Sequence, residues 1–250
     1  YYVDLGNGSY EIILKVYREC GPANTQGTDF DDIITLGVFS TASNQLINDY
    51  DVFLNINTVQ NVPVIMTNPC GIPPSDLCIE EATYSLIVNL PENTSGYTVC
   101  WQRCCRNPTI SNLDNVFGDF PGMTSTVTIP GTNQISPVTN NSPIFQEFPP
   151  VAICANFEFF FDHSATDDDG DELIYSFCAP FDGADGNNPA PNPPSNPPYN
   201  PVPYANGFSA DYPITSDPAF QIDPVTGMIT GTPTMPGQYA MGICCEEFRD

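Results

Sequence analysis

The stretch YEIILKVYR, residues 10 to 18, is rich in β-branched, aromatic and long apolar side chains and contains neither glycine nor proline. This composition is typical of a β-strand. No segment of the chain sustains the i, i+3, i+4, i+7 apolar pattern of an amphipathic helix over three turns. The sequence therefore predicts an all-β protein. Similar short runs recur between clusters of glycine, proline, asparagine and aspartate: IITLGVFS (33–40), YDVFLNIN (50–57), ATYSLIVNL (82–90), GYTVCW (96–101), TSTVTI (124–129), NFEFFF (156–161), ELIYSF (172–177), AFQI (219–222), GMIT (227–230) and GQYAMGI (237–243).

The charge balance excludes two classes of partner. Lys and Arg total 5 against 30 Asp and Glu, which gives a formal net charge of −25. Such a chain repels the phosphate backbone of nucleic acids and the surface of anionic membranes. No apolar run approaches the ~20 residues that a helix needs to cross a bilayer. We expect no nucleic-acid partner and no direct insertion into a membrane.

Length and proline distribution predict two domains. The chain has 250 residues, which is enough for about two domains of ordinary size. The stretch SPIFQEFPPVAIC (142–154) holds three prolines and separates the strand-like runs into two sets. We therefore place a boundary near residue 148, between one β-sandwich over residues 1–147 and another over residues 148–250. Many short strands bounded by turn residues are the pattern of such sandwiches.

The cysteines predict a disulfide-rich, extracellular protein. Ten cysteines accompany a single histidine, whereas zinc modules repeat Cys and His ligands at short paired spacings. Spacing does not reveal which cysteines pair. An even number of cysteines lies on each side of the predicted boundary, so each domain could close its bonds internally. The disulfide candidates are Cys20, Cys70, Cys78, Cys100, Cys104 and Cys105 before the boundary, and Cys154, Cys178, Cys244 and Cys245 after it.

Two segments place adjacent cysteines near an arginine: GYTVCWQRCCR (96–106) and GQYAMGICCEEFR (237–249). We interpret them as equivalent late strands of two related modules. Neighbouring residues on a strand face opposite ways, so each adjacent pair is expected to form bonds in two directions. A redox-active vicinal pair or a soft-metal site is the functional alternative.

A proline-rich insertion occupies about residues 187–205 of the second domain. Its centre, PAPNPPSNPPYNPVP (189–203), contains eight prolines and predicts an extended, polyproline-II-like loop rather than a central strand. The expected arrangement is a rigid, self-packed loop with Tyr199 and Tyr204 as anchors. The alternative is a docking site for an aromatic-lined groove of a partner protein.

The stretch DHSATDDDGDELIYSF (162–177) concentrates carboxylates just before a strand. Asp167, Asp169 and Asp171 are spaced as oxygen ligands for Ca²⁺, and the glycine between Asp169 and Asp171 lets the chain fold back around an ion. The segment is not an EF-hand, because the glycine and the last ligand fall at the wrong positions. Repulsion among the carboxylates favours a bound cation over the alternative, a solvated acidic turn. We predict a calcium site at these three residues.

Catalytic motifs are scarce. The only histidine, His163, lies between Asp162 and Ser164, and adjacent residues cannot adopt the geometry of a catalytic triad. We expect it on the surface. The sequence has no Gly-rich phosphate loop, no GxSxG and no HExxH. Paired carboxylates would need a cleft that the sequence does not show. We therefore expect no enzymatic activity.

The second half carries a family resemblance. FEFFFDHSATDDDGDELIYSF (157–177) and AFQIDPVTGMITGTPTMPGQYAMGI (219–243) resemble the cadherin-like and Ig-like repeats of bacterial surface proteins. LGNGSYEIILKVYREC (5–20) and CCEEFRD (244–250) look like the N-terminal region of very large secreted surface proteins of the Bacteroidota, a group that includes gliding-motility adhesins of the SprB type. The cysteine load and the proline-rich insertion depart from the common repeat. The resemblance implies two Ig-like or cadherin-like β-sandwiches on an exported multidomain chain, with calcium at Asp167, Asp169 and Asp171.

These features together predict a non-enzymatic module at the cell surface, part of a larger adhesin or filament protein, which is disulfide-braced and calcium-stiffened and serves adhesion or self-assembly. Its partners would be other domains or copies of the same surface protein, and the strand-like start predicts a portion of a longer polypeptide. The alternative is a carbohydrate-binding module of a secreted protein, with surface glycans as ligands. That function requires exposed aromatic side chains on one strand face, and the candidates are Tyr1, Tyr2, Tyr10, Tyr17 and Trp101.

Overall fold

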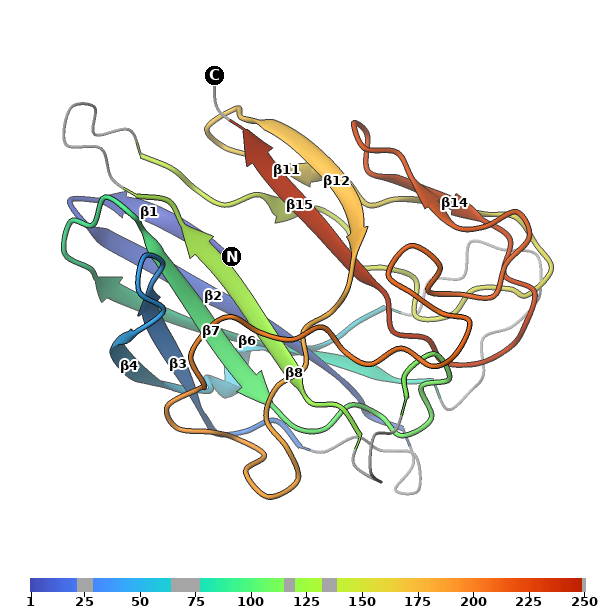
Figure 1. Ribbon diagram of the computed structural model, residues 1–250, viewed down its shortest axis with the longest axis horizontal. Helices are drawn as coiled ribbons and strands as arrows, with labels where there is room; N and C mark the ends of the chain where they lie inside the picture. Colours follow the sequence, from blue (N-terminus) through green and yellow to red (C-terminus); the bar gives the residue numbers. More distant parts are fainter. Residues whose placement is uncertain (22–28, 64–76, 115–119, 132–138, 249–250) are drawn as a thin grey trace.

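The computed structural model describes residues 1–21, 29–63, 77–114, 120–131 and 139–248. Over these residues the protein consists of β-strands joined by long connections, without any α-helix (Figure 1). Every pair of neighbouring strands is antiparallel. The prediction of an all-β fold is therefore confirmed. Within the described residues there is also no helix of the length and apolarity needed to cross a membrane.

Two four-stranded sheets enclose the larger core. Sheet one has the order β1 (Tyr2–Gly6), β2 (Ser9–Glu19), β6 (Ile79–Asn89) and β5 (Val59–Asn61), the last preceded by a short 3-10 helix (Ile56–Thr58). Sheet two has the order β4 (Leu46–Phe53), β3 (Ile33–Ser40), β7 (Tyr97–Arg103) and β8 (Met123–Ile129). Alternate side chains of each strand point inward, so Tyr10 and Ile12 of sheet one pack in one core with Val38 and Trp101 of sheet two.

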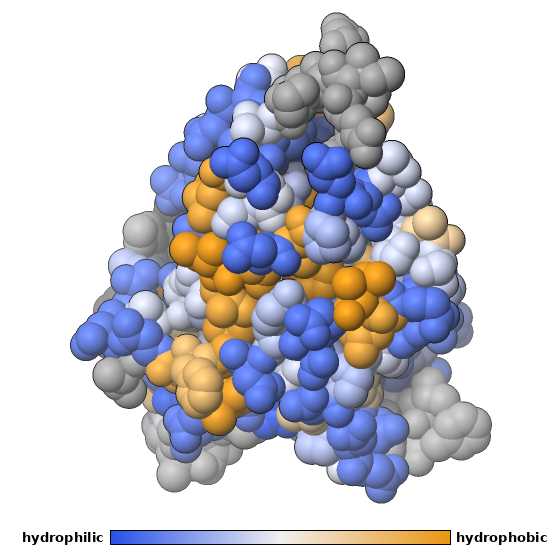
Figure 2. Space-filling model, turned by 90° about the vertical axis from the view of Figure 1, so that its left-hand side faces the viewer, coloured by the Kyte–Doolittle hydropathy of each residue, from blue (hydrophilic) through white to orange (hydrophobic). Residues whose placement is uncertain are grey.

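The opposite face of sheet one carries apolar side chains as well as charged ones. Leu5 and Ile87 are 48% and 58% exposed, and they alternate along β1 and β6 with inward residues such as Val88. Figure 2 shows the side of the molecule where apolar side chains interrupt an otherwise hydrophilic surface. The outer face of sheet one is therefore only partly covered, with Leu5 and Ile87 exposed to solvent.

Shorter sheets make up the C-terminal part (Figure 1). One sheet has the order β10 (Phe159–Asp162), β14 (Met228–Gly231) and β13 (Gln221–Ile222), while β12 (Glu172–Cys178) pairs with β15 (Gly242–Phe248) and β9 (Ile144–Phe145) with β11 (Ala165–Thr166). The smaller core contains Phe159, Ile214, Phe220 and Ile229. The predicted boundary near residue 148 falls between β9 and its partner strand β11.

A buried asparagine joins the two parts of the chain. Asn112 is 0% exposed. Its Nδ2 donates to the carbonyl oxygens of Pro213 (2.8 Å) and Ala240 (2.7 Å), and its Oδ1 accepts from the backbone N–H of Ala240 (2.8 Å). One side chain thus satisfies three backbone groups of the C-terminal part, as a buried polar network requires.

The proline-rich insertion packs on the outer face of sheet two. Phe39, Cys100 and Gln102 point away from the core, yet they are 0%, 1% and 3% exposed. Gln102 bonds with the side chain of Ser195 (Nε2 to Oγ, 2.9 Å) and accepts the backbone N–H of Ser195 (2.9 Å). A Cβ at Gly37 would lie 2.7 Å from Cε2 of Phe39 and 3.3 Å from Cδ of Pro194, so the glycine makes room for the Phe39 ring beside the insertion.

Hydrogen bonds at both ends hold the insertion in place. Arg103 and the backbone N–H of Cys104 both donate to the carbonyl oxygen of Pro189, at 3.1 and 2.8 Å. Tyr199 hydrogen-bonds the side chain of Cys100 and donates to the carbonyl oxygen of Ser195 (3.1 Å). The insertion is therefore packed against its own protein, with Tyr199 as an anchor.

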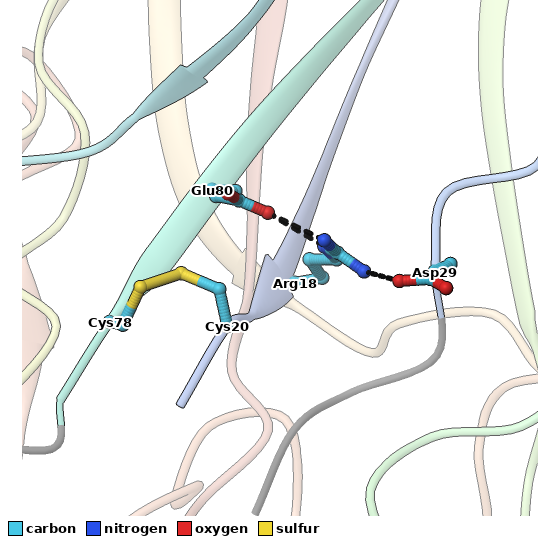
Figure 3. Close-up of polar contacts among 5 residues, drawn as sticks. All are labelled: Arg18, Cys20, Asp29, Cys78 and Glu80. Atoms are coloured by element: carbon cyan, nitrogen blue, oxygen red, sulfur yellow. Dashed lines mark hydrogen bonds and ion pairs between the residues drawn. A yellow bond between two sulfur atoms is a disulfide. The ribbon is translucent and has the colours of Figure 1, made fainter. Parts of the chain in front are cut away.

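Among the described residues, two disulfides with both partners defined link distant segments. Cys20 at the end of β2 bonds to Cys78 just before β6, with 5.0 Å between their Cα atoms, and Cys178 bonds to Cys244 across β12 and β15. Figure 3 shows Arg18 beside the first bond, paired with Glu80 (2.8 Å) and with Asp29. The end of the longest strand pair is thus held by a covalent bond and by charged groups together.

The remaining cysteines differ from the expectation. Cys104 and Cys105 bond to each other, so the prediction that they bond in two directions is wrong. Cys100 and Cys245, both predicted as disulfide candidates, are free thiols. Cys154 is disulfide-bonded, and the candidate Cys70 lies outside the described residues. The two Cys-Cys segments are not equivalent either, since the first pair follows β7 whereas the second lies inside β15.

The free thiols give a direct test of this pairing. From the described residues, we expect the denatured, non-reduced chain to offer two thiols for alkylation, those of Cys100 and Cys245. In the native protein they should react slowly, because burial raises the pKa of Cys100 to about 12 and that of Cys245 to about 11, and the thiolate is the reactive form. Peptide mass mapping identifies the sites; alkylation at Cys178 or Cys244 would contradict the pairing.

Candidate metal site

The acidic turn between β11 and β12 is organised by its first aspartate. One oxygen of Asp167, Oδ1, accepts the backbone N–H groups of Asp169 (2.9 Å) and Asp171 (3.1 Å). Gly170 has a φ of 80°, a conformation that other residues rarely adopt. The chain therefore folds back on itself at this position, as the sequence pattern predicts.

Three carboxylates converge at the turn. Asp167, Asp171 and Glu247 each place one oxygen within 4.8 Å of the others. Glu247 belongs to β15, where it lies opposite Leu173 of β12. The sequence spacing identified the two aspartates but missed the glutamate, because only the pairing of β12 with β15 brings it to the turn.

The third predicted ligand has a different neighbour. Asp169 is exposed, and its Oδ2 accepts from the backbone N–H (2.5 Å) and the side-chain Nδ2 (3.2 Å) of Asn141. Asn140, the preceding residue, donates from Nδ2 to Glu247 (2.6 Å) and to the hydroxyl of Tyr2 in β1 (2.8 Å). Asp169 thus holds Asn141 beside the triad, and the preceding residue, Asn140, also contacts Tyr2 of sheet one.

The donor set fits a hard divalent cation. Oδ2 of Asp167 is buried and has no hydrogen-bond partner in the described structure, and a buried carboxylate oxygen without a partner is costly. Three converging carboxylates repel one another unless a cation neutralises them. Ca²⁺ takes six to eight oxygen ligands from carboxylates, carbonyls and water. Asp167, Asp171 and Glu247 would hold such an ion, which would supply charge neutralisation.

No match was found. Comparison with protein-family models, with curated proteins and with solved structures gives no relative for this chain. Its functional assignment therefore rests on the geometry and chemistry of its own residues.

The aromatic residues proposed for carbohydrate binding do not form an exposed face. Tyr2, Tyr10 and Trp101 lie in the larger core, with exposed fractions of 0%, 4% and 6%. Tyr17 is partly exposed, but its ring packs on Phe148, 4.4 Å between centroids, and its hydroxyl donates to Glu81 (2.6 Å). Tyr2, Tyr10 and Trp101 are therefore not available for an aromatic platform of the kind that a carbohydrate-binding module needs, whereas Tyr1 and Tyr17 are partly exposed.

The expected surface position of His163 is wrong. The imidazole is only 6% exposed and stacks on Phe145, with ring centroids 4.3 Å apart and planes 8° from parallel. Apolar residues on both sides of it in the fold exclude water. Sequence reasoning missed this because Asp162 and Ser164, its neighbours along the chain, are polar.

Proposed function

We propose that the chain is a non-enzymatic, extracellular module of a larger adhesin or filament protein, composed of two Ig-like or cadherin-like β-sandwiches that are braced by disulfides and stiffened by Ca²⁺. The all-β architecture and the two long-range disulfides support the mechanical part of this proposal. Disulfides persist in oxidising, extracellular compartments. Each typically stabilises a domain by about 2 to 4 kcal/mol, which is useful to a protein under shear.

The position of the acidic triad carries the proposal. Asp167 and Asp171 come from the turn before β12 and Glu247 from β15, and Asn140 connects Glu247 to Tyr2 in sheet one. An ion held by the triad would therefore fix the junction between the C-terminal strands and sheet one. A stiff junction lets the module transmit force to neighbouring domains or to other copies of the same surface protein, the partners that we propose.

Calcium should raise the stability of the protein measurably. At a free concentration about 100 times Kd, a ligand that binds only the folded state adds about 2.7 kcal/mol, or about 5 to 10 °C in Tm for a chain of this size. We expect EDTA to lower the Tm and Ca²⁺ to restore it, as monitored by calorimetry. Glu247→Gln should abolish most of the calcium response and, in EDTA, should be at least as stable as the wild type because one repelling charge is gone.

Asp168→Asn is the matched control. Asp168 is in the same turn and is exposed, but it is not a member of the triad. Its replacement changes the net charge by the same amount as Glu247→Gln and should leave the calcium response intact. Equal responses in the wild type and in Glu247→Gln would refute the site.

The cellular part of the proposal needs a separate measurement. Immunogold electron microscopy on intact cells that produce the protein, with an antibody raised against the folded chain, should label the outer surface or filaments extending from it. Brief EDTA treatment should change the stiffness or order of labelled structures if the ion fixes the junction. Labelling confined to the cell interior would refute the surface assignment while leaving the metal site testable on its own.

A further inference from the structure

His163 occupies an enclosed position between two elements. Its ring stacks on Phe145 of β9 and lies 5.4 Å from the ring centroid of Phe161 in β10. The backbone carbonyl of Glu147 acts on the ring in the direction that favours its protonated form. The ring nitrogen Nδ1 is buried and has no hydrogen-bond partner in the described structure.

The segment that His163 contacts, residues 144–148, bridges the two parts of the chain, and we call it the strap. On one side β9 pairs with β11, and Gln146 bonds to Ser164 (3.1 Å, backbone) and Thr166 (2.6 Å, side chain). On the other side, Phe148 packs on Tyr17 of β2. The strap therefore connects the C-terminal strands to sheet one, and the ring of His163 packs against it at Phe145.

On balance the ring's surroundings favour the neutral form over the protonated one. Protonation would place a second N–H among aromatic rings with no acceptor, and a buried polar group without a partner is costly. The elements around the ring contribute Phe145, Phe161, the backbone of Gly227 and the carbonyl of Glu147, whose own carboxylate is exposed. Asp162, the neighbouring residue in β10, is the charged group that favours the protonated ring, and it is fully exposed to solvent screening.

We propose that His163 is an acid-sensitive latch: its neutral ring holds the strap on β10 and β11, and its protonation in mildly acidic surroundings releases the strap and loosens the junction with sheet one. The direction of the pH dependence follows from the burial of the ring. Burial lowers the pKa of His163 from its usual 6.5, so the opened strap takes up the proton first. The contribution of His163 to the stability of the closed strap is therefore fully present above pH 6.5 and decreases as the pH falls below that value.

The chain has one histidine, so its imidazole signals in a proton NMR titration need no assignment. In the folded protein we expect the ring to titrate at a lower pH than in the urea-unfolded chain. Equal or higher values in the folded protein would overturn the proposal without any mutation. Measurements between pH 5 and 7.5, in saturating Ca²⁺ and again in EDTA, separate the effect of the latch from any effect of the acidic triad.

Hydrogen exchange of the Gln146 amide reports the strap directly. Corrected for intrinsic rates, its protection should fall by up to about tenfold for each pH unit below 6.5 in the wild type. In His163→Gln, which keeps a side-chain N–H donor but cannot be protonated, protection should be independent of pH. His163→Phe, which keeps the stacking, is the second variant should the first fold poorly. A pH dependence equal to that of the wild type in either folded variant would overturn the proposal.

Discussion

Replacing Asn112 with leucine is expected to lower the free energy of unfolding by at least about 3 kcal/mol, because three backbone groups lose their partner and each buried, unsatisfied group costs about 1 to 3 kcal/mol. The groups are the carbonyl oxygens of Pro213 and Ala240 and the N–H of Ala240. Leucine has the same number of side-chain heavy atoms, branched at the same position, and is not smaller than asparagine, so the loss would not come from a cavity. Urea unfolding followed by fluorescence measures it.

Asn112→Asp provides the control for the direction of the hydrogen bonds. The carboxylate keeps an acceptor for Ala240 N–H but sets a negative charge against two carbonyl oxygens. At pH 7 we expect at least as large a loss as with leucine. The loss should shrink in acid, because a buried carboxylate has a raised pKa and regains a donor when it is protonated. A leucine variant within 1 kcal/mol of the wild type would show that water or a shifted loop replaces the asparagine.

Removal of the Cys178–Cys244 bond should also lower the stability strongly. The bond closes a loop with a sequence separation of 66, and loop-closure entropy for that length corresponds to about 4 kcal/mol of stability. The smaller core has four fully buried apolar residues to offset the loss. The double variant Cys178→Ala, Cys244→Ala avoids a new bond between Cys178 and Cys245. We expect thermal unfolding of the C-terminal part well before the rest.

Cys245→Ser is the matched control for that experiment. Cys245 is adjacent to the bonded Cys244 in β15 but carries a free thiol. Its replacement removes a sulfur from the same strand without opening the loop and should change stability by less than about 1 kcal/mol. If both variants lost the same stability, the effect would come from packing rather than from the covalent bond.

Strands with an alternating or uniformly apolar pattern were predictable from the sequence. YEIILKVYR, IITLGVFS and TSTVTI correspond to β2, β3 and β8. The predicted strand bounds were wrong where pairing with another strand, rather than the local sequence, sets the position of a strand. GQYAMGI was expected to be the last strand, but β15 runs over Gly242–Phe248 and includes two cysteines and two glutamates, because the pairing with β12 sets its position. β9 and β11 have two residues each and leave no periodic signal.

The residues of the candidate site also fall into those that the sequence identifies and those that only the fold brings together. Asp167 and Asp171 are close in sequence, so turn chemistry alone brings them together. Glu247 and Asn112 act across long sequence separations, and no local pattern identifies them. The pairing of cysteines had the same limit, since adjacent cysteines and free thiols depend on which strand ends meet. The domain boundary near residue 148 and the Ig-like identity of each part stay predictions.

The proline-rich cover of sheet two has a consequence for biosynthesis. Cys100 and Gln102 are shielded by residues that follow them by more than ninety positions in the chain. While the chain is being made, this sheet face and the thiol of Cys100 stay uncovered until the proline-rich insertion has been synthesised. A nascent chain stalled before residue 189 would therefore present the Cys100 thiol to any oxidising enzyme that it meets.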